Sequence, residues 1–577
     1  MGPLISIHSG FLSIVILLYF FNAPAFASPN STQLSSQIAR YDSITTEGDY
    51  LSMLREADEA TFQREFEAEF LLLLDNDQRE QFSRLTLLEE RKAYIEKYWK
   101  VSNPNPLLPL NDRLLNHLQR RAYARQNFST LSPPYFDDRG KYYIKYGKPH
   151  FRYQDFGGER SMEGLVSIPF KYYSVIPNES WSYVNVWPNY VVHFMQKNDG
   201  YKEIESLKEV ILDSQRRGRM VWYWSDLMKR RFWMSSQVSN TVNDIEQLEI
   251  EMAVANGGRP LIRDIGTSSN KISDEIFRNL ERVEYEMTLA SADVPPSAYD
   301  PIAAKNKIPV TPLVCQFRGA NGRTRLEIAL FAPLKHFLNR KIPIHLSNIH
   351  SEFSVLLSNQ HHDSLTTQTA TRAFPASAAV AAGLSNLVGH ITVYIPPQPV
   401  VMAYQVKNVN NQKIGFGQQE MGLRDFRDHR LMLSDIQLLT PIPNDTLSQV
   451  LPKIEKQGLP FAPYPHSTIK KSLPLFCYFE IYHLTPQESD YEITYRVYRD
   501  KKREGPLKKV AKKLTGAKDE SISITNQRQF TSEAAEELIQ LDLQNLATGP
   551  YKLEINVRSA KPTGESVVVE QEITVED

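Results

Sequence analysis

The 577-residue sequence is poor in cysteine and carries no dominant charge. Only Cys315 and Cys477 occur, which excludes a small scaffold stapled by disulfides. Lys and Arg number 66 against 67 Asp and Glu, which argues against nucleic-acid binding across the whole surface. Each cysteine lies in an apolar, strand-like run. The two could pair in an exported chain, but we expect two free, buried thiols.

The sequence also lacks the short motifs that mark many enzymes. It contains no G-x-S-x-G nucleophile elbow, no H-E-x-x-H zinc helix, no P-loop, no G-x-G-x-x-G and no EF-hand loop. Catalytic triads recur without a fixed sequence pattern, so these absences only lower the expectation of an enzyme. No catalytic residue, metal site or cofactor is predicted.

Beyond the N-terminus, no apolar run is long enough to cross a membrane. The N-terminus itself has one, FLSIVILLYFF at 11–21, followed by the small-x-small pattern Ala25-Phe26-Ala27. This order is typical of a secretory signal peptide, although the segment before the run has no Lys or Arg. We expect cleavage and an extracytoplasmic protein, with an uncleaved anchor as the alternative.

What the chain does contain is ordinary globular material in segments of different periodicity. Phe62, Phe66 and Phe70 recur at helical spacing, whereas the chain from Ile308 onward alternates as strands do. The fold class predicted is α+β multidomain, with N-terminal helical hairpins and two antiparallel β-sandwiches. The predicted segments are a signal peptide 1–27, a flexible leader 28–45, a helical region 46–130, an α+β unit with a helical connector 131–300, and sandwiches 308–445 and 466–577.

Several short runs support the strand predictions. Residues 314–331 form an apolar hairpin around a Gly-Ala-Asn-Gly turn. The proline-rich stretch 441–465 is expected to divide the two sandwiches. Further expected strands are 180–186, 190–196, 390–395, 400–406, 432–439, 474–484, 491–498, 521–524, 551–557 and 567–575.

The most informative stretch is YFDDRGKYYIKYGKP at 135–149. Its alternation predicts a turn, a strand over 141–146 and a second turn, with Tyr143 and Tyr146 on opposite faces. Gly140 and Gly147 suit positions of positive φ or close backbone approach. The adjacent acids that precede Gly140 could serve general acid–base catalysis, but turn formation is the more common use of such a pair.

This stretch, together with 90–106 and 111–128, resembles the GWxTD-domain family of bacterial exported proteins. That family carries the run G-W-x-T-D-R-G-x-x-Y-I-x-Y-G-x-P. The matching residues are Asp138, Arg139, Gly140, Tyr143, Ile144, Tyr146, Gly147 and Pro149. Pro134, Tyr135 and Asp137 stand where the family has Gly, Trp and Thr. Trp181 and the segments 433–438, 474–486 and 547–557 resemble later parts of the family. The resemblance implies export and architecture, and it supplies no catalytic residues.

Two other polar groups are candidate sites. His336, His345, His350, His361 and His362, with Asp363, have spacings that fit neither helical pairs nor zinc loops, so exposed loop histidines are expected. Asp425, Asp428, His429 and Arg430 precede a strand, where a solvated turn or an ion pair is expected rather than a site.

The segment 216–233 mixes arginines with tryptophans and is the best candidate for binding a partner. The candidate residues are Trp222, Trp224, Arg230 and Arg231. The alternative is an amphipathic helix that buries Val221, Trp224, Leu227 and Met228 and leaves its cations in water.

These observations favour a non-enzymatic interaction or scaffold protein of the cell envelope or periplasm, with an unknown protein partner and no nucleic acid. Two alternatives stay open. One is an unrecognised hydrolase of envelope polymers. The other is a carbohydrate- or peptide-binding sandwich protein.

Overall fold

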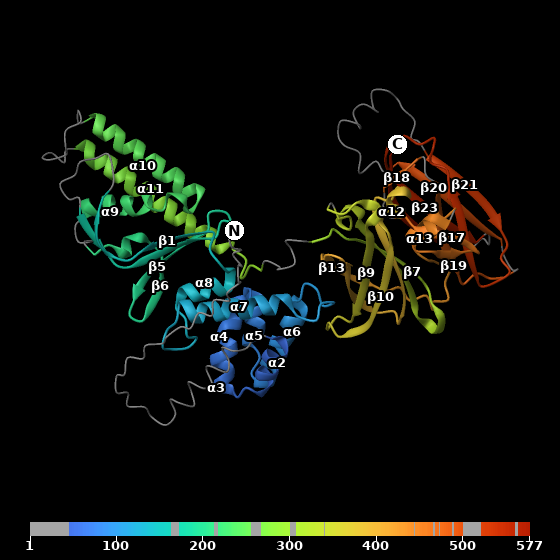
Figure 1. Cartoon of the computed structure of the whole chain (residues 1–577), viewed down its shortest axis with the longest axis horizontal. Coiled ribbons are helices and arrows are strands. Elements are labelled where there is room, and N and C mark those ends of the chain that lie inside the picture. The colour runs from blue at the N-terminus through green and yellow to red at the C-terminus, as the bar shows by residue number, and fades with distance from the viewer. Residues whose placement is uncertain are drawn as a thin grey trace, which may run out of the picture. The chain divides into compact units, whose positions relative to one another are not determined.

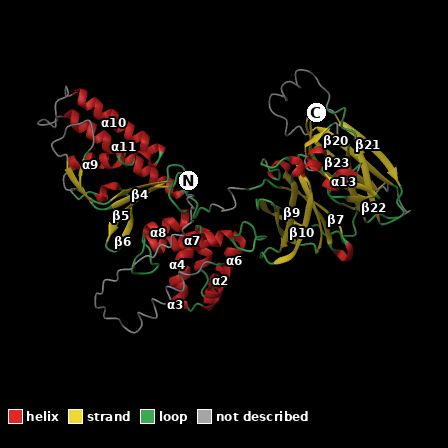
Figure 2. Cartoon of the chain, viewed as in Figure 1, coloured by secondary structure: helices red, strands yellow, loops and turns green. Residues whose placement is uncertain are grey.

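The computed structural model mixes helices with several antiparallel sheets, as the sequence predicts in outline (Figures 1 and 2). It describes residues 46–162, 172–212, 217–255, 267–299, 307–339, 341–443, 445–464, 468–471, 474–486, 490–499, 521–559 and 564–576. The predicted signal peptide and leader lie outside these residues. Within them, no helix is both long and apolar enough to cross a membrane.

Residues 46–150 are helical, and side-chain caps define where the helices begin. Thr46, Asp58 and Asn111 each accept a hydrogen bond from a backbone N–H in the first helical turn, which satisfies groups that a helix start leaves open. Phe62 and Phe66 are buried, as their spacing predicts. The elements are α2 (Glu47–Glu56), α3 (Glu59–Phe62), the π-helical turn η1 (Gln63–Glu67), α4 (Ala68–Phe70), η2 (Leu71–Leu73), α5 (Asn76–Ser83), α6 (Leu88–Ser102), α7 (Asp112–Asn127) and α8 (Asp138–Tyr146).

Helix α8 corrects the strand predicted over 141–146. Asp137 caps its start, and Gly147, at φ 76°, ends it. Gly140 and Ile144 are buried one helical turn apart. The run of tyrosines and lysines matches a two-residue period almost as well as a helical one. The caps at Asp137 and Gly147 are the features that favour the helix. Both glycine predictions are confirmed, because an added Cβ at Gly140 would lie 2.6 Å from Phe136 Cβ.

An α+β unit follows, built on the antiparallel sheet β1–β4–β5–β6. Helices α10 and α11 lie side by side (Figure 1), and with α9 they share one core with strand β5. The predicted strand 180–186 is shorter in the structure and ends at Ser182. The elements are β1 (Phe151–Asp155), β2 (Gly158–Ser161), β3 (Tyr172–Val175), β4 (Asn178–Ser182), β5 (Val191–Lys197), β6 (Gly200–Ile204), η3 (Leu207–Val210), α9 (Arg217–Lys229), η4 (Phe232–Met234), α10 (Ser236–Ala255) and α11 (Thr267–Ala292).

The chain from 307 to 422 forms a sandwich-like pair of sheets, β10–β9–β12–β13 and β11–β8–β7, around a shared core. The predicted hairpin is confirmed, since β7 and β8 pair antiparallel across the turn η6. The elements are β7 (Thr311–Arg318), η6 (Ala320–Gly322), β8 (Thr324–Pro333), η7 (Leu334–His336), η8 (Ile344–Leu346), β9 (Asn348–Ser358), β10 (Ser364–Pro375), α12 (Ala376–Ala381), β11 (Asn386–Ile395), β12 (Pro399–Asn408) and β13 (Ile414–Gly422).

The remaining chain forms a second pair of sheets with its own core. Residues 432–463 contribute strands to the sheet that holds β19 and β22, so the predicted boundaries at 445 and 466 are wrong. The proline-rich stretch contributes β15, β16 and β17 to this sheet, while its Ile442, Val450, Leu451 and Ala462 pack in the core of the first pair of sheets. The elements are β14 (Met432–Leu433), β15 (Gln437–Pro441), α13 (Asp445–Val450), β16 (Ile454–Lys456), β17 (Leu459–Pro463), β18 (Thr468–Lys470), β19 (Leu475–Tyr482), β20 (Tyr491–Arg499), β21 (Ser521–Arg528), β22 (Ala534–Leu541), β23 (Gly549–Ser559) and β24 (Ser566–Glu576).

Both cysteines are free and buried, as expected from their apolar surroundings. Cys315 of β7 packs with Leu439 and Tyr478 in a small core that joins the two β modules. Cys477 belongs to the core of the second module. Burial raises the pKa of both thiols, which therefore stay protonated and act as small apolar side chains.

Candidate functional site

The family-like motif lies where helix α8 meets the sheet of the α+β unit. Arg139 donates to Asp137, at 2.7 Å, and to Glu179 on β4, at 2.8 Å. Glu179 also accepts from Arg152, at 2.9 Å, and from the Trp181 indole N–H, at 2.8 Å. Asp137 and Glu179 are buried. We call these five residues the Arg139 hub, and its ion pairs join the helix to the sheet.

The adjacent acids of the motif act as structural acceptors. Asp137 accepts from the backbone N–H of Tyr201 at 2.9 Å, and Asp138 accepts from that of Glu203 at 2.9 Å. Burial opposes ionisation of Asp138, but hydrogen bonds from Lys141 and the Glu203 N–H outweigh it and lower its pKa. An ionised, internally paired carboxylate is poorly suited to donate a proton, so this geometry favours the capping interpretation over acid catalysis.

The later motif residues pack α8 against its neighbours. Tyr143 stacks on Tyr123 of α7 with ring centroids 4.2 Å apart. Tyr146 is buried and donates to the Pro295 carbonyl at 3.1 Å. The Gly147 carbonyl accepts from the Tyr183 hydroxyl at 3.1 Å. Ile144 and Pro149 are buried. The opposite-face prediction for Tyr143 and Tyr146 fails because both lie on a helix.

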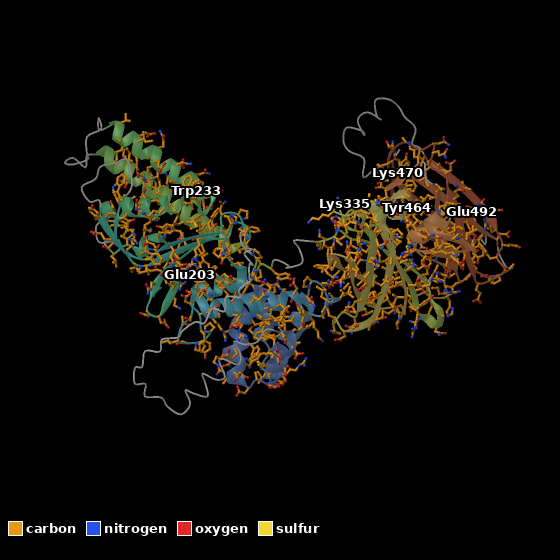
Figure 3. All side chains as sticks on the ribbon, viewed as in Figure 1. Glu203, Trp233, Lys335, Tyr464, Lys470 and Glu492 are labelled. Atoms are coloured by element: carbon orange, nitrogen blue, oxygen red, sulfur yellow. The ribbon has the colours of Figure 1, made fainter. Side chains whose placement is uncertain are left out.

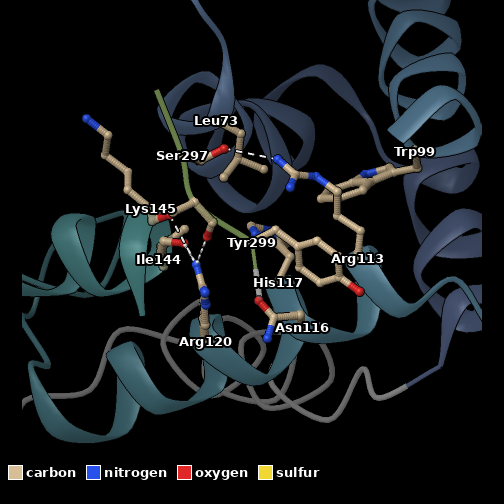
Figure 4. Close-up of a pocket in the computed structure, with 11 residues that line it drawn as sticks. Leu73, Trp99, Arg113, Asn116, His117, Arg120, Ile144, Lys145, Ser297 and Tyr299 are labelled. Atoms are coloured by element: carbon tan, nitrogen blue, oxygen red, sulfur yellow. Dashed lines mark hydrogen bonds between the residues drawn. The ribbon is translucent and has the colours of Figure 1, made fainter. Parts of the chain in front are cut away.

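Residues 295–299 lie against α7 and α8, and their Ser297, Ala298 and Tyr299 line a small hollow together with residues of both helices (Figure 4). Arg120 Nη1 donates to the carbonyls of Ile144, Lys145 and Ala298, at 3.2, 3.1 and 2.7 Å. The Ala298 N–H donates in return to the Lys145 carbonyl at 2.9 Å. We call segment 295–299 the strap and its site the α7–α8 groove. The groove holds the strap through its main-chain atoms at Ala298 and through side chains at Ser297 and Tyr299.

Side-chain contacts hold the C-terminal end of the strap. Arg113 donates to the Ser297 hydroxyl at 3.0 Å and lies 5.4 Å from the centre of the Tyr299 ring. The Tyr299 hydroxyl donates to Asp112 at the start of α7. The groove is also lined by Leu73, Trp99, Asn116 and His117. Burial and the nearby arginine charges lower the pKa of His117 to about 3, so its imidazole is neutral.

The tryptophans predicted to bind a partner are buried instead. Trp222 is 7% exposed and Trp224 is fully buried, with its indole N–H donating to Glu284 of α11 at 2.9 Å. Arg231 is 1% exposed, and Arg230 pairs with Asp226 at 2.9 Å. The tryptophans therefore belong to the apolar face of α9, as the amphipathic alternative predicts, but Arg231 is buried rather than in water and the Arg230 side chain stays 21% exposed.

Arg231 takes part in a buried polar group that sequence reasoning missed. Its Nε donates to the Ser180 hydroxyl at 2.6 Å, and Ser180 Oγ lies 2.7 Å from His193 Nδ1. Burial, and then the Arg231 charge, lowers the pKa of His193 to about 3. A serine beside a neutral imidazole can act as a nucleophile and base, but all three residues are buried inside the unit. They are separated by 13 and 51 positions, so no sequence motif marks them.

A second buried polar group joins the two β modules. Glu327 of β8 accepts from Lys456 of β16 at 2.7 Å and from Gln437 of β15 at 2.9 Å. Burial opposes ionisation of Glu327, but the His390 ring, whose Nε2 lies 3.7 Å from the carboxylate, together with Lys456 and Gln437, lowers its pKa to about 2. The Glu327 group therefore links the two β modules.

Among the described residues, the histidine group is spread over separate elements, with His336 in η7, His345 in η8 and His350 in β9. No set of three or more His, Cys, Asp or Glu side chains there is arranged to hold a metal ion. Asp425 pairs with Arg427, and Asp428 pairs with Arg430, on an exposed turn. His361 and His362 lie in the turn between β9 and β10.

Comparison with known proteins identifies no family for this chain. No family model matches it, and no curated protein matches it significantly. Among solved structures, it is similar to the crystal structure of red sea bream transglutaminase, at 8% identity and a TM-score of 0.15. That match covers 52% of this chain and 34% of the transglutaminase chain, so the chain spans about a third of its length.

Proposed function

We propose that this chain is an exported, GWxTD-like protein that acts as a non-enzymatic interaction or scaffold protein of the cell envelope. The motif match and the apolar N-terminal run support export and the family assignment. The division into a GWxTD-like α+β unit with a helical connector and two β-sandwich modules belongs to the same proposal.

The α7–α8 groove is the observation that carries the proposal. It holds the strap in part through the Ala298 N–H and carbonyl, and main-chain contacts of this kind do not depend on the identity of the bound side chain. Arg120 supplies a fixed, always charged donor for carbonyls. In this proposal the strap is an internal occupant, and an extended segment of a partner takes its place.

The motif supports a structural role as well. The charged groups of the Arg139 hub face one another rather than a cavity, and Asp137 and Glu179 are both buried. A protein that presents surfaces to partners needs such a rigid framework between its helices and its sheet.

Affinity capture from an envelope fraction tests the proposal. The bait is the full chain, and the matched variant is Ala298→Pro, which removes the N–H that donates to Lys145. We expect a specific partner whose yield rises severalfold with the variant, because the strap then competes less well. An excess of synthetic strap peptide should displace that partner.

Two results would contradict the proposal. One is capture that neither the variant nor the peptide changes. The other is release of fragments from purified envelope polymer by the protein, which supports the hydrolase alternative instead.

A further inference from the structure

A hollow of about 390 Å³ lies apart from the strap, on the α+β unit. Small-molecule sites commonly have about 300–1,000 Å³, so the space suffices for a small ligand. Three stretches distant in sequence form it: the start of β1, the connection from β4 to β5, and η4 with the start of α10. Its lining includes the rings of Phe151 and Trp233 and the polar side chains of Asn189 and Ser236.

Two aromatic rings in this lining face solvent. Trp233, labelled in Figure 3, is 76% exposed, and Phe151 is 43% exposed. Trp181 and Trp224 of the same unit are fully buried, which shows that the interior of the unit accepts indole rings. The exposure of Trp233 is therefore not the rule for tryptophans in this unit. Trp233 makes an edge contact with Phe232, with ring centroids 4.8 Å apart, which restrains it. The face of such a ring is electron-rich and attracts weakly positive C–H groups.

An oriented amide accompanies the rings. Asn189 Oδ1 accepts from the Ser236 hydroxyl at 2.9 Å and from the Gln237 N–H at 3.4 Å. These bonds fix the amide, and no hydrogen bond found among the described residues uses its Nδ2. Nδ2 is therefore left with two donors, while Ser236 Oγ keeps acceptor capacity. Asn189 has a φ of 60°, a conformation that asparagine tolerates better than most residues.

The lining of the hollow carries no charge. None of its residues is Asp, Glu, Lys, Arg or His. A phosphate or carboxylate ligand would lose part of its hydration there without gaining a countercharge, which is unfavourable. The lining therefore offers exposed aromatic rings, an amide donor and hydroxyl groups, and no charge. These groups suit a ligand whose faces carry C–H groups and whose edges carry hydroxyls.

We propose that this hollow binds one or two rings of a neutral oligosaccharide. A sugar ring lies against Trp233 or Phe151, and its hydroxyls accept from Asn189 Nδ2 and donate to Ser236 Oγ. The site is in the α+β unit and not on a β-sandwich, and it is independent of the α7–α8 groove.

Titration of the full chain with neutral trisaccharides tests the inference. The probes are the β-1,4-linked trimers of glucose and of N-acetylglucosamine and the α-1,4-linked trimer of glucose, each followed by calorimetry. At least one should bind with saturation. Trp233→Ala and Asn189→Asp should each weaken that binding at least tenfold. The aspartate keeps the shape and the positive φ but removes the two donors.

The matched control is Trp187→Ala, which removes a 36% exposed indole that does not line the hollow. Its affinity should stay within twofold, and near-ultraviolet circular dichroism should show that all three variants are folded. Failure of all three sugars to bind would overturn the inference. So would binding that Trp233→Ala leaves unchanged, or saturable binding of a decaproline peptide to Trp233 in place of the sugars. None of these results bears on partner capture at the strap.

Discussion

At the scale of single residues, buried charge decides what the motif can do. Glu179 is fully buried and is satisfied by Arg139, Arg152 and the Trp181 indole. Removal of one member of a buried ion pair typically costs about 3–5 kcal/mol, because the partner charge stays buried without a partner. The carboxylate is therefore required for stability, whatever its other uses.

Glu179→Gln should lower the free energy of unfolding of the helical region and the α+β unit by about 3 kcal/mol. Urea unfolding followed by Trp fluorescence measures it, because all six tryptophans lie between Trp99 and Trp233. The surface variant Glu209→Gln, at an exposed capping position, should cost about 1 kcal/mol or less. Equal effects of the two variants would show that the hub pairs contribute little.

His193 makes the stability of the α+β unit depend on pH. Its pKa is about 3 in the fold, against about 6.5 in an unfolded chain, so the unfolded state binds the proton first. Stability is full above about pH 6.5 and falls as the pH drops toward 3, by about 1.4 kcal/mol per unit for one group. His193→Asn should reduce this slope between pH 4 and 6 in the same urea assay. A slope that stays the same would contradict a neutral, buried His193.

At the scale of elements, two competing effects meet at Gly140. Alanine is favoured over glycine inside a helix by about 0.5–1 kcal/mol, whereas overpacking a filled site costs about 1–3 kcal/mol. Because the added Cβ would lie 2.6 Å from Phe136 Cβ, packing should outweigh propensity.

Gly140→Ala should therefore destabilise the protein by about 1 kcal/mol or more in the Trp-detected urea transition. Gly48→Ala is the matched control, because Gly48 lies in α2 with nothing within 4 Å of the added Cβ. It should leave stability unchanged or raise it slightly. If Gly140→Ala also stabilises, the close packing of α8 on Phe136 is wrong.

The elements also show which sequence patterns were sufficient to predict local structure. The four-residue spacing of Phe62, Phe66 and Phe70 and the turn of the 314–331 hairpin predicted their elements correctly. The 135–149 stretch did not, because a nine-residue helix offers too few turns to separate the two periods. The strap and the hollow were missed, since each combines segments that only the fold brings together.

At the scale of the whole molecule, the β modules are joined by apolar contacts around Cys315 and by the Glu327 group. Lys456 and Glu327 are 5% and 6% exposed, so each depends on the other. Sequence could not predict this pair, because 129 positions separate the residues and Lys456 lies in a stretch expected to be a linker.

Lys456→Met should lower the stability of the β modules by about 3 kcal/mol, because Glu327 loses its buried cation. Calorimetry of the full chain should show that transition at lower temperature, while the Trp-detected transition stays unchanged. The double variant Glu327→Gln/Lys456→Met should recover part of the loss. A double variant less stable than the single one would contradict the ion pair as the cause.

The central claim is that the α7–α8 groove receives extended polypeptide and that the strap is its internal occupant. Photo-cross-linking in intact cells, from a photoreactive residue at Asn116 in the groove lining, tests it most directly. We predict two products, one to the strap and one to a partner, with Ala298→Pro shifting the ratio toward the partner. A single product to the strap, unchanged in amount by Ala298→Pro, would contradict the account.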